Sequence, residues 1–289
     1  MTYLLTNKDL KNTSAVLRVK GPDANTYLQG QFTQDLRLAE KGPIYGLWLD
    51  QKGKVVADSC IIRMAVSDFL VVGFAGPAAL LLARLEAYLI ADEVELHDVT
   101  GEWAGLLIWG DSLPDLSLPA GAQIFPSRRA GPQAREILVP VAQADEVLAQ
   151  VRKCATEGTR DAAELARLRA ALPAVPADIG PRDLPAEGAL DGVAISFTKG
   201  CYLGQEVIAR LKNLGQVRRA LHLVSGAGAP PASGTALHQG DRKIGEVRSS
   251  AAEGDGFLAM AMLSLVNLDA AAPLGVAAGG DGIRILRRV

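Results

Sequence analysis

The chain has 289 residues, of which 49% are hydrophobic and 21% are charged, and its formal net charge at pH 7 is −2. This composition is typical of a globular protein and excludes a disordered chain or a small disulfide scaffold. The weak net charge gives no overall attraction for RNA or DNA, so we expect no direct nucleic-acid binding. No run reaches the roughly 18 apolar residues of a membrane span, and we expect no membrane contact. Three separated cysteines and three scattered histidines favour neither disulfides nor a metal site, which fits a reducing cytoplasm.

The first 160 residues mix strand and helix patterns. Two runs rich in β-branched residues, 54–65 and 68–74, flank a short turn and predict a hairpin. Gly76-Pro77 opens a helical stretch in which Leu81 and Leu85 share one face. Hairpins, rather than regular strand–helix–strand units, favour an α+β fold of antiparallel sheets with helices on one face. Further strands are expected at 95–99, 106–109 and 136–139, and a helix at 143–156.

The next segments predict a change of architecture. A helix begins with a capping arrangement of Asp161 and Glu164 and ends at Pro173. Residues 173–185 hold four prolines and are expected to form an ordered loop across the surface. Short strands separated by Gly, Asp and Pro turns then predict a small β-barrel or sandwich, which divides the chain into residues 1–215 and 216–289. These strands are expected at 219–224, 235–238, 243–248, 257–265 and 282–286.

The segment KGCYLGQEVIARL, residues 199–211, is the most unusual in the chain. Its apolar spacing predicts a helix that begins near Gly204, which places Cys201 beside the helix N-terminus. Free backbone N–H groups, the helix dipole and Lys199 would favour a thiolate and lower the cysteine pKa below about 8.5. The alternative, a small buried hydrophobe, is equally open for Cys201 on chemistry alone and is favoured for Cys60 and Cys154.

KGCYLGQE, residues 199–206, resembles the signature of the YgfZ family, which is related to the folate-binding T-protein of glycine cleavage (GcvT). Three more segments resemble the family in order and spacing. They are GPDANTYLQGQFTQD at 21–35, LWLDQKGKVVAD at 47–58, with Asp50 where Asn is commoner, and the approach to the signature at 166–197. The resemblance therefore spans nearly the whole chain.

The resemblance implies a ring of two ferredoxin-like α+β subdomains and a C-terminal small β-barrel. It also implies tetrahydrofolate binding and support of iron–sulfur enzymes as clients, including a tRNA methylthiolase, with no metal of its own. Cys201 would be the redox-active or transiently bonded thiol, with Lys199 and Gly200 shaping its surroundings. The remaining signature residues that would fix the loop are Tyr202, Gly204, Gln205, Glu206 and Arg210.

Two departures separate the chain from the T-protein itself. The paired aspartates of that enzyme fall here on Ala57 and Asp58, and its pterin-reading glutamate falls near Pro132. A folate-dependent aminomethyltransferase or other one-carbon transferase, with Asp58 as its acid–base residue, is therefore the alternative reading. A purely structural adaptor is a third.

Polar residues that can contact a folate are Gln29, Gln31, Asp35 and Asp58. The alternative for the first three is a polar turn between helix and strand, and for Asp58 a solvated strand residue. A run of cations near the signature could meet a folate glutamate tail, a phosphate backbone or an acidic partner, or could be a solvated helix face. Its members are Lys199, Arg210, Lys212, Arg218 and Arg219.

Overall fold

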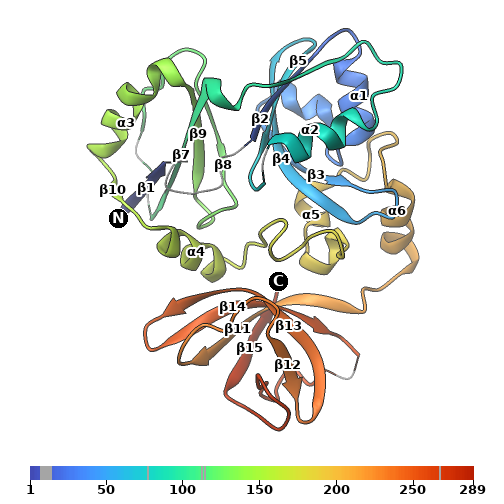
Figure 1. Cartoon of the computed structure of the whole chain (residues 1–289), viewed down its shortest axis with the longest axis vertical. Helices are drawn as coiled ribbons and strands as arrows, with labels where there is room; N and C mark the ends of the chain where they lie inside the picture. The colour runs from blue at the N-terminus through green and yellow to red at the C-terminus, as the bar shows by residue number, and fades with distance from the viewer. Residues whose placement is uncertain (7–14, 77, 112, 114, 267) are drawn as a thin grey trace.

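The computed structural model describes residues 1–6, 15–76, 78–111, 113, 115–266 and 268–289. Its strands form three five-stranded sheets, one in each of three modules (Figure 1). The two α+β modules lie side by side above the barrel, and the helices that precede the barrel lie between the three. This arrangement confirms the predicted α+β class.

The first module is an antiparallel sheet in the order β3-β4-β5-β2-β6. One face is covered by α1 and α2, whose Leu28 and Leu85 pack with Phe32 and Trp48. The β4–β5 hairpin was predicted, whereas β2, β3 and α1 were not, and Pro77 lies outside the described residues. The elements are β2 (Ala15–Lys20), α1 (Ala24–Gln31), η1 (Leu36–Glu40), β3 (Ile44–Leu49), β4 (Val55–Ala65), β5 (Asp68–Gly73), α2 (Ala78–Glu86) and β6 (Glu95–Asp98).

The second module has the strand order β10-β1-β7-β9-β8 and takes its β1 from the start of the chain. Its sheet packs on the first through Phe125 and Leu138, which contact Cys60 and Ile62. The predicted cap of the 161–172 helix is wrong, because α4 begins after Thr159, whose side chain accepts from the backbone N–H of Ala162. The elements are β1 (Thr2–Thr6), η2 (Thr100–Glu102), β7 (Trp103–Gly110), β8 (Gln123–Pro126), β9 (Arg135–Pro140), η3 (Val141–Gln143), α3 (Ala144–Arg152), β10 (Thr156–Glu157) and α4 (Arg160–Arg169).

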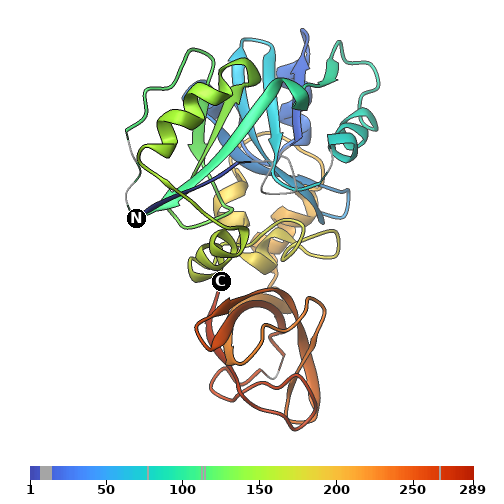
Figure 2. The ribbon, with the colours of Figure 1, turned by 60° about the vertical axis from the view of Figure 1, so that its left-hand side comes forward.

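The C-terminal module is a barrel, seen end-on in Figure 2. Its sheet runs β12-β13-β14-β11-β15, and the bridges His238–Gly275 and Leu274–Ile283 connect β12 to β15. Apolar side chains such as Phe257 fill the interior. The strands are β11 (Arg219–Ala227), β12 (Ala236–Gln239), β13 (Arg242–Glu253), β14 (Gly256–Ser264) and β15 (Ile283–Arg288), so a barrel rather than a sandwich is confirmed.

The proline-rich loop is irregular, as expected, but only part of it lies at the surface, where Pro176, Ala177, Pro181 and Arg182 are exposed. Val175, Ile179 and Asp178 are buried between the modules. Asp178 forms an ion pair with Arg167 of α4 at 2.7 Å and accepts a hydrogen bond from Ser249 of the barrel at 2.6 Å. A loop can be buried here because its carboxylates satisfy backbone N–H groups and arginines that would otherwise lack partners.

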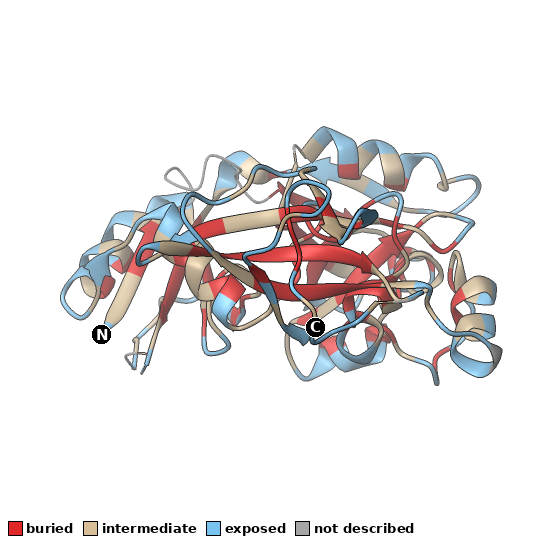
Figure 3. Ribbon diagram, turned by 90° about the horizontal axis from the view of Figure 1, so that it is seen from below, coloured by how far each residue is buried: buried red, intermediate tan, exposed pale blue. Residues whose placement is uncertain are grey.

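Three helical elements follow this loop and lead into the barrel: η4 (Pro185–Gly188), α5 (Asp191–Ala194) and α6 (Gln205–Leu214). Figure 3 shows that the buried residues concentrate in the strands, while the outer helix faces are exposed. No helix in the described part of the chain is long and apolar enough to cross a bilayer. The predicted division at residue 215 falls between α6 and β11 and stays a prediction.

Candidate functional site

The signature loop lies against the end of α1. The backbone N–H of Ser196 donates to Thr33 O, and that of Leu203 donates to Gly30 O, both at 3.0 Å. The Thr33 hydroxyl donates to Ala194 O at 2.7 Å and accepts from the N–H of Leu47 at 2.8 Å. Two segments noted separately in the sequence, 28–35 and 199–206, are therefore neighbours in space.

Lys199 anchors this contact. Its side chain is buried, with 6% of the residue exposed. Its Nζ donates to the carbonyls of Gln29 and Phe32, each at 2.6 Å, and to that of Gln34 at 3.2 Å. Burial lowers the pKa of Lys199 to about 8, against the raising effect of nearby Asp35. An ammonium group has three N–H donors, and all three are engaged by the α1 end, so Lys199 holds the loop in place.

Cys201 stands two residues further along and is exposed. A side-chain carbon built at Gly200, next to Cys201, or at Gly30 of the neighbouring α1 would meet no described heavy atom within 4 Å, so the backbone faces open space at both positions. The alternative of a buried hydrophobe therefore does not hold for Cys201. It is confirmed for Cys60, and it is wrong for Cys154, which lies exposed just beyond the end of α3.

Gly204 caps α6 in a conformation that only glycine adopts without strain, with φ at 83°. A Cβ at this position would lie 2.6 Å from the carbonyl oxygen of Asp50, because α6 begins directly on the β3–β4 turn. In that turn Asp50 Oδ1 accepts from the N–H groups of Lys52 and Lys54, both at 2.8 Å. Asp and Asn offer the same acceptor oxygen, which explains why Asp can stand where the family more often has Asn.

The rest of the signature divides into buried and exposed members. Tyr202 is buried in the core between α6 and the barrel, and burial raises its pKa to about 12. The N–H of Gln205 donates to Tyr202 O at 3.1 Å, which closes the turn before α6. Glu206 and Arg210 are exposed on the helix.

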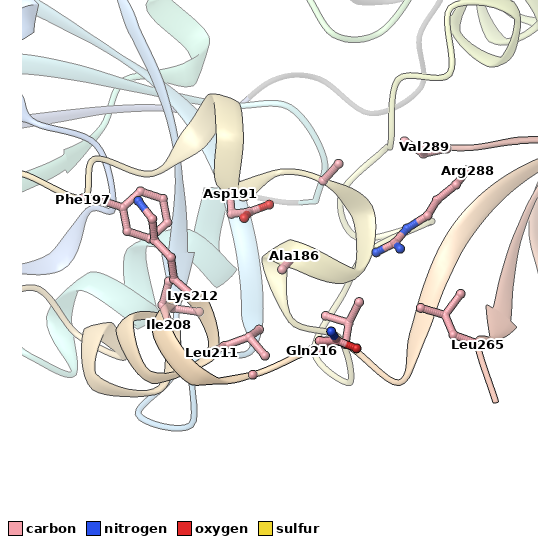
Figure 4. A pocket seen from close by; sticks show the side chains of 13 residues that line it. Ala186, Asp191, Phe197, Ile208, Leu211, Lys212, Gln216, Leu265, Arg288 and Val289 are labelled. Carbon is pink, nitrogen blue, oxygen red and sulfur yellow. The ribbon is translucent and has the colours of Figure 1, made fainter.

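A pocket of about 710 Å³ lies between α6, α5 and the barrel (Figure 4). On one wall the Lys212 Nζ lies 3.3 Å from the centre of the Phe197 ring, a cation–π contact. Arg219 of the same cationic run pairs with Glu187 at 2.8 Å, while Lys199 is buried. The run is therefore not one solvated face, because folding gives its members different partners.

The polar side chains at the end of α1 shape their own turn. Gln29 Oε1 accepts from the N–H of Leu36 at 2.8 Å, and its Nε2 donates to Asp35 at 3.3 Å. Arg37 pairs with Asp35 at 2.6 Å, and their hydrogen bond lowers the pKa of this carboxyl to about 2. Gln31 accepts from Arg84 Nη1 at 3.0 Å. These contacts match the polar-turn alternative.

Asp58 lies apart from the signature, on β4. It is 6% exposed, and the Tyr45 hydroxyl donates to its Oδ2 at 3.0 Å. Burial raises the pKa of Asp58 to about 6, although the Tyr45 hydrogen bond and the charge of Arg128 act in the opposite direction. The expectation of a solvated strand residue for Asp58 was wrong.

Asp58 lines a pocket of about 400 Å³ together with Phe74, Arg128, parts of α4 and the buried loop at 173–177. The Arg128 guanidinium lies 5.2 Å from the centre of the Tyr45 ring. Its Nε is buried, and no hydrogen-bond partner for it is present in the described part of the chain. Sequence reasoning missed both residues. The only sequence signal was the alternation in β3 (IYGLWL), which puts Tyr45 on the same side as Leu47 and Leu49.

Comparison with known proteins agrees with this architecture. Residues 9–115 match the GCVT N-terminal domain, and residues 204–287 match the CAF17 C-terminal beta-barrel domain. The tRNA-modifying protein YgfZ of Vibrio vulnificus is 29% identical over 255 residues, which cover 84% of this chain and 77% of that protein. The chain is therefore similar to YgfZ proteins over most of its length, and it combines a match to the GCVT N-terminal domain with a match to the CAF17 C-terminal barrel.

Other relatives and a solved structure extend this result. A mitochondrial iron–sulfur cluster assembly factor, the IBA57 homolog of Pyricularia oryzae, is 30% identical over 71% of this chain and 54% of that protein. The glycine cleavage aminomethyltransferase T of Bartonella henselae superposes with a TM-score of 0.80 at 20% identity, covering 94% of this chain and 81% of that chain. The solved structure confirms the GcvT-like fold of this chain.

Proposed function

We propose that this chain is a folate-binding accessory protein that supports iron–sulfur enzymes of tRNA modification through the Cys201 thiol. The observation that carries the proposal is an exposed thiol on a loop that is itself held firmly by buried contacts. The names of similar proteins, two tRNA-modifying proteins and an iron–sulfur cluster assembly factor, also support a role in iron–sulfur-dependent tRNA modification.

The surroundings of Cys201 suit a reaction with a large partner. Lys199 and the Leu203 N–H fix the loop on both sides of the cysteine, so the thiol keeps a defined position. The open flanks at Gly200 and Gly30 allow another protein to approach without displacing side chains. A positioned, accessible thiol is what transient bonding to a client requires.

For the folate we propose the Asp58 pocket rather than the end of α1. Its volume of about 400 Å³ lies within the range of small-ligand sites. A reduced pterin has N–H groups that can donate to the Asp58 carboxylate, and its acceptor atoms suit a guanidinium such as that of Arg128, which also lines the pocket. Gln29 and Asp35 are engaged within their own turn and would contribute little.

Bound tetrahydrofolate would supply a carrier of one-carbon units. The chain's own residues would bind and orient it: Asp58 as hydrogen-bond acceptor, held by Tyr45, and Arg128 as donor. The pocket is lined by α4, the buried loop and β4, while Cys201 lies on the loop before α6. We therefore assign ligand binding and thiol chemistry to different places, as in an accessory protein that senses or carries a folate.

The test is Cys201→Ser in cells that lack their own homologue, with an assay of iron–sulfur-dependent tRNA methylthiolation. Cys154→Ser is the matched control, because it removes the other exposed thiol. We expect Cys201→Ser to lose at least tenfold in methylthiolation while binding tetrahydrofolate normally by calorimetry, and Cys154→Ser to behave as wild type. Full activity of the Cys201 variant would reject the thiol role, and no heat of tetrahydrofolate binding would reject the folate role.

A one-carbon transferase is the second candidate, and one observation favours it. Asp58 has a pKa of about 6, and a group with a pKa near the operating pH is suited to general acid–base catalysis. Incubation with tetrahydrofolate and aminomethyl or methyl donors would then yield a new folate species, and Asp58→Asn would abolish it. The absence of any product with wild-type protein would rule this candidate out.

A further inference from the structure

A further pocket, of about 540 Å³ and lined by many cations, lies where the barrel meets the first module. Its walls come from β11, β13 and β14, from the segment before η4, and from the β3–β4 turn. The whole chain has a formal net charge of −2, so the positive charge gathered here is a local feature. The cations in its lining are Lys54, Arg182, Arg218, Arg219, Lys243 and Arg248.

Half of these cations are compensated by carboxylates. Three arginines meet three acidic side chains and form a layer of ion pairs that fixes the floor of the pocket. The pairs are Arg219–Glu187 (2.8 Å), Arg219–Asp183 (2.9 Å), Arg248–Asp183 (3.1 Å) and Arg182–Glu246 (3.3 Å).

The other three cations are a surplus. Within the described residues, no carboxylate lies within 4 Å of Lys54, Arg218 or Lys243. Lys54 donates instead to the carbonyl of Arg182 at 3.0 Å, and the side chains of Arg218 and Lys243 are exposed. This contact of Lys54 is also exposed, so all three surplus charges face solvent.

Arg248 adds a positive charge that is fixed in the wall of the pocket. Its side chain is 8% exposed and lines the pocket. Its Nε is buried and has no hydrogen-bond partner among the residues that the structure describes. The Nε itself is too buried for a ligand to reach, so Arg248 would act on an anion in this pocket through its positive charge.

We propose that this basic pocket binds phosphate groups, supplied either by a nucleotide or by an RNA backbone. A phosphate group carries up to two charges and three strong acceptor oxygens in a small volume, and arginine forks recognise it in a bidentate manner. Among the residues that the structure describes, no aromatic side chain lines the pocket, so recognition would use phosphates and not base stacking. The site is independent of Cys201 and Asp58 and goes beyond the proposed function. An RNA source would run against the expectation of no direct nucleic-acid binding, which rested on the net charge and on the low aromatic content of 5%.

The test compares two charge-matched double variants of the full chain. R218Q/K243Q removes the two exposed surplus cations. R284Q/K153Q removes one arginine and one lysine that are also exposed, from β15 and from the end of α3. Neither pair touches the ion-pair layer, so both variants should melt like wild type. The probes are sodium tripolyphosphate, a 20-residue oligouridylate and a polyglutamate of similar charge, each titrated by calorimetry in about 150 mM salt.

We expect tripolyphosphate or oligouridylate to bind wild type, at least tenfold weaker binding to R218Q/K243Q, and less than a twofold change in R284Q/K153Q. An RNA source is identified if oligouridylate binds more tightly than tripolyphosphate. The slope of log K against log salt concentration should then be smaller by about 1 to 2 in R218Q/K243Q than in wild type. Tighter binding of tripolyphosphate identifies a nucleotide. The proposal is overturned if neither tripolyphosphate nor oligouridylate binds wild type, or if both double variants lose the same amount of affinity. It is also overturned if polyglutamate binds wild type as tightly as these probes and its binding is weakened in R218Q/K243Q. Cys201→Ser should leave these affinities unchanged, so failure here is distinct from failure of the thiol role.

Discussion

The Asp58 pocket and the signature loop both contain a buried charged group, but they use it in opposite ways. Lys199 has three backbone acceptors for its three donors, so its charge stabilises the fold and leaves Cys201 as the exposed group. Asp58 has one hydroxyl donor, and burial raises its pKa to about 6. A buried charge whose donors are all used anchors the fold, whereas one with a single side-chain partner beside a cavity is a candidate ligand contact.

The largest effect should come from the anchor. Lys199→Met keeps the length of the side chain but leaves three carbonyls without a donor, and we expect a loss of about 4 kcal/mol in the free energy of unfolding. Urea denaturation measures this loss, and alkylation of Cys201 should become faster as the loop loosens. Lys212→Met is the matched control, since that lysine has only a cation–π contact, and it should lose less than about 1 kcal/mol. Equal losses in the two variants would remove the distinction between anchor and surface lysine.

A smaller, pH-dependent effect is expected at Asp58. Its folded-state pKa of about 6 lies above the usual 3.8, so the folded chain holds this proton to higher pH than the unfolded chain does. Proton binding at Asp58 therefore stabilises the folded chain, and this stabilisation is complete below about pH 4 and is lost as the pH rises through 6. Relative to wild type, Asp58→Asn should therefore gain stability over this window, reaching about 3 kcal/mol at pH 7. Urea denaturation from pH 4 to 7.5 measures the difference.

Tyr45→Phe is the companion to this experiment. The Tyr45 hydrogen bond lowers the pKa of Asp58, so its removal should move the same window to higher pH. A difference between Asp58→Asn and wild type that does not vary with pH would contradict the buried, under-satisfied carboxyl.

The smallest effect should appear at Gln29. Gln29→Ala removes the acceptor for the N–H of Leu36, and we expect a loss of about 1 kcal/mol in the free energy of unfolding with unchanged tetrahydrofolate affinity. Thermal unfolding and calorimetry on the same sample separate the two quantities. Weaker folate binding in this variant would move the proposed folate site from the Asp58 pocket to the end of α1.

Much of the fold could be predicted from local patterns. The hairpin of β4 and β5, the helix α6 and the barrel strands each have a period or a turn signal of their own. The buried path of the 173–185 loop could not, because four prolines predict only irregular backbone and not what surrounds it. The exposure of Cys154 was missed for a related reason, since a lone cysteine carries no signal of its burial.

The signature, the start of α6 and the two classes of module could be predicted from local sequence, because each depends on residues close together in the chain. The packing of distant segments brings Lys199 to the carbonyls near residue 30, Tyr45 and Arg128 to Asp58, and six cations to one side of the barrel. Burial and charge pairing are properties of the packed environment, which segments far apart in sequence create jointly. A local sequence pattern therefore does not predict which partner a polar side chain contacts in the folded chain.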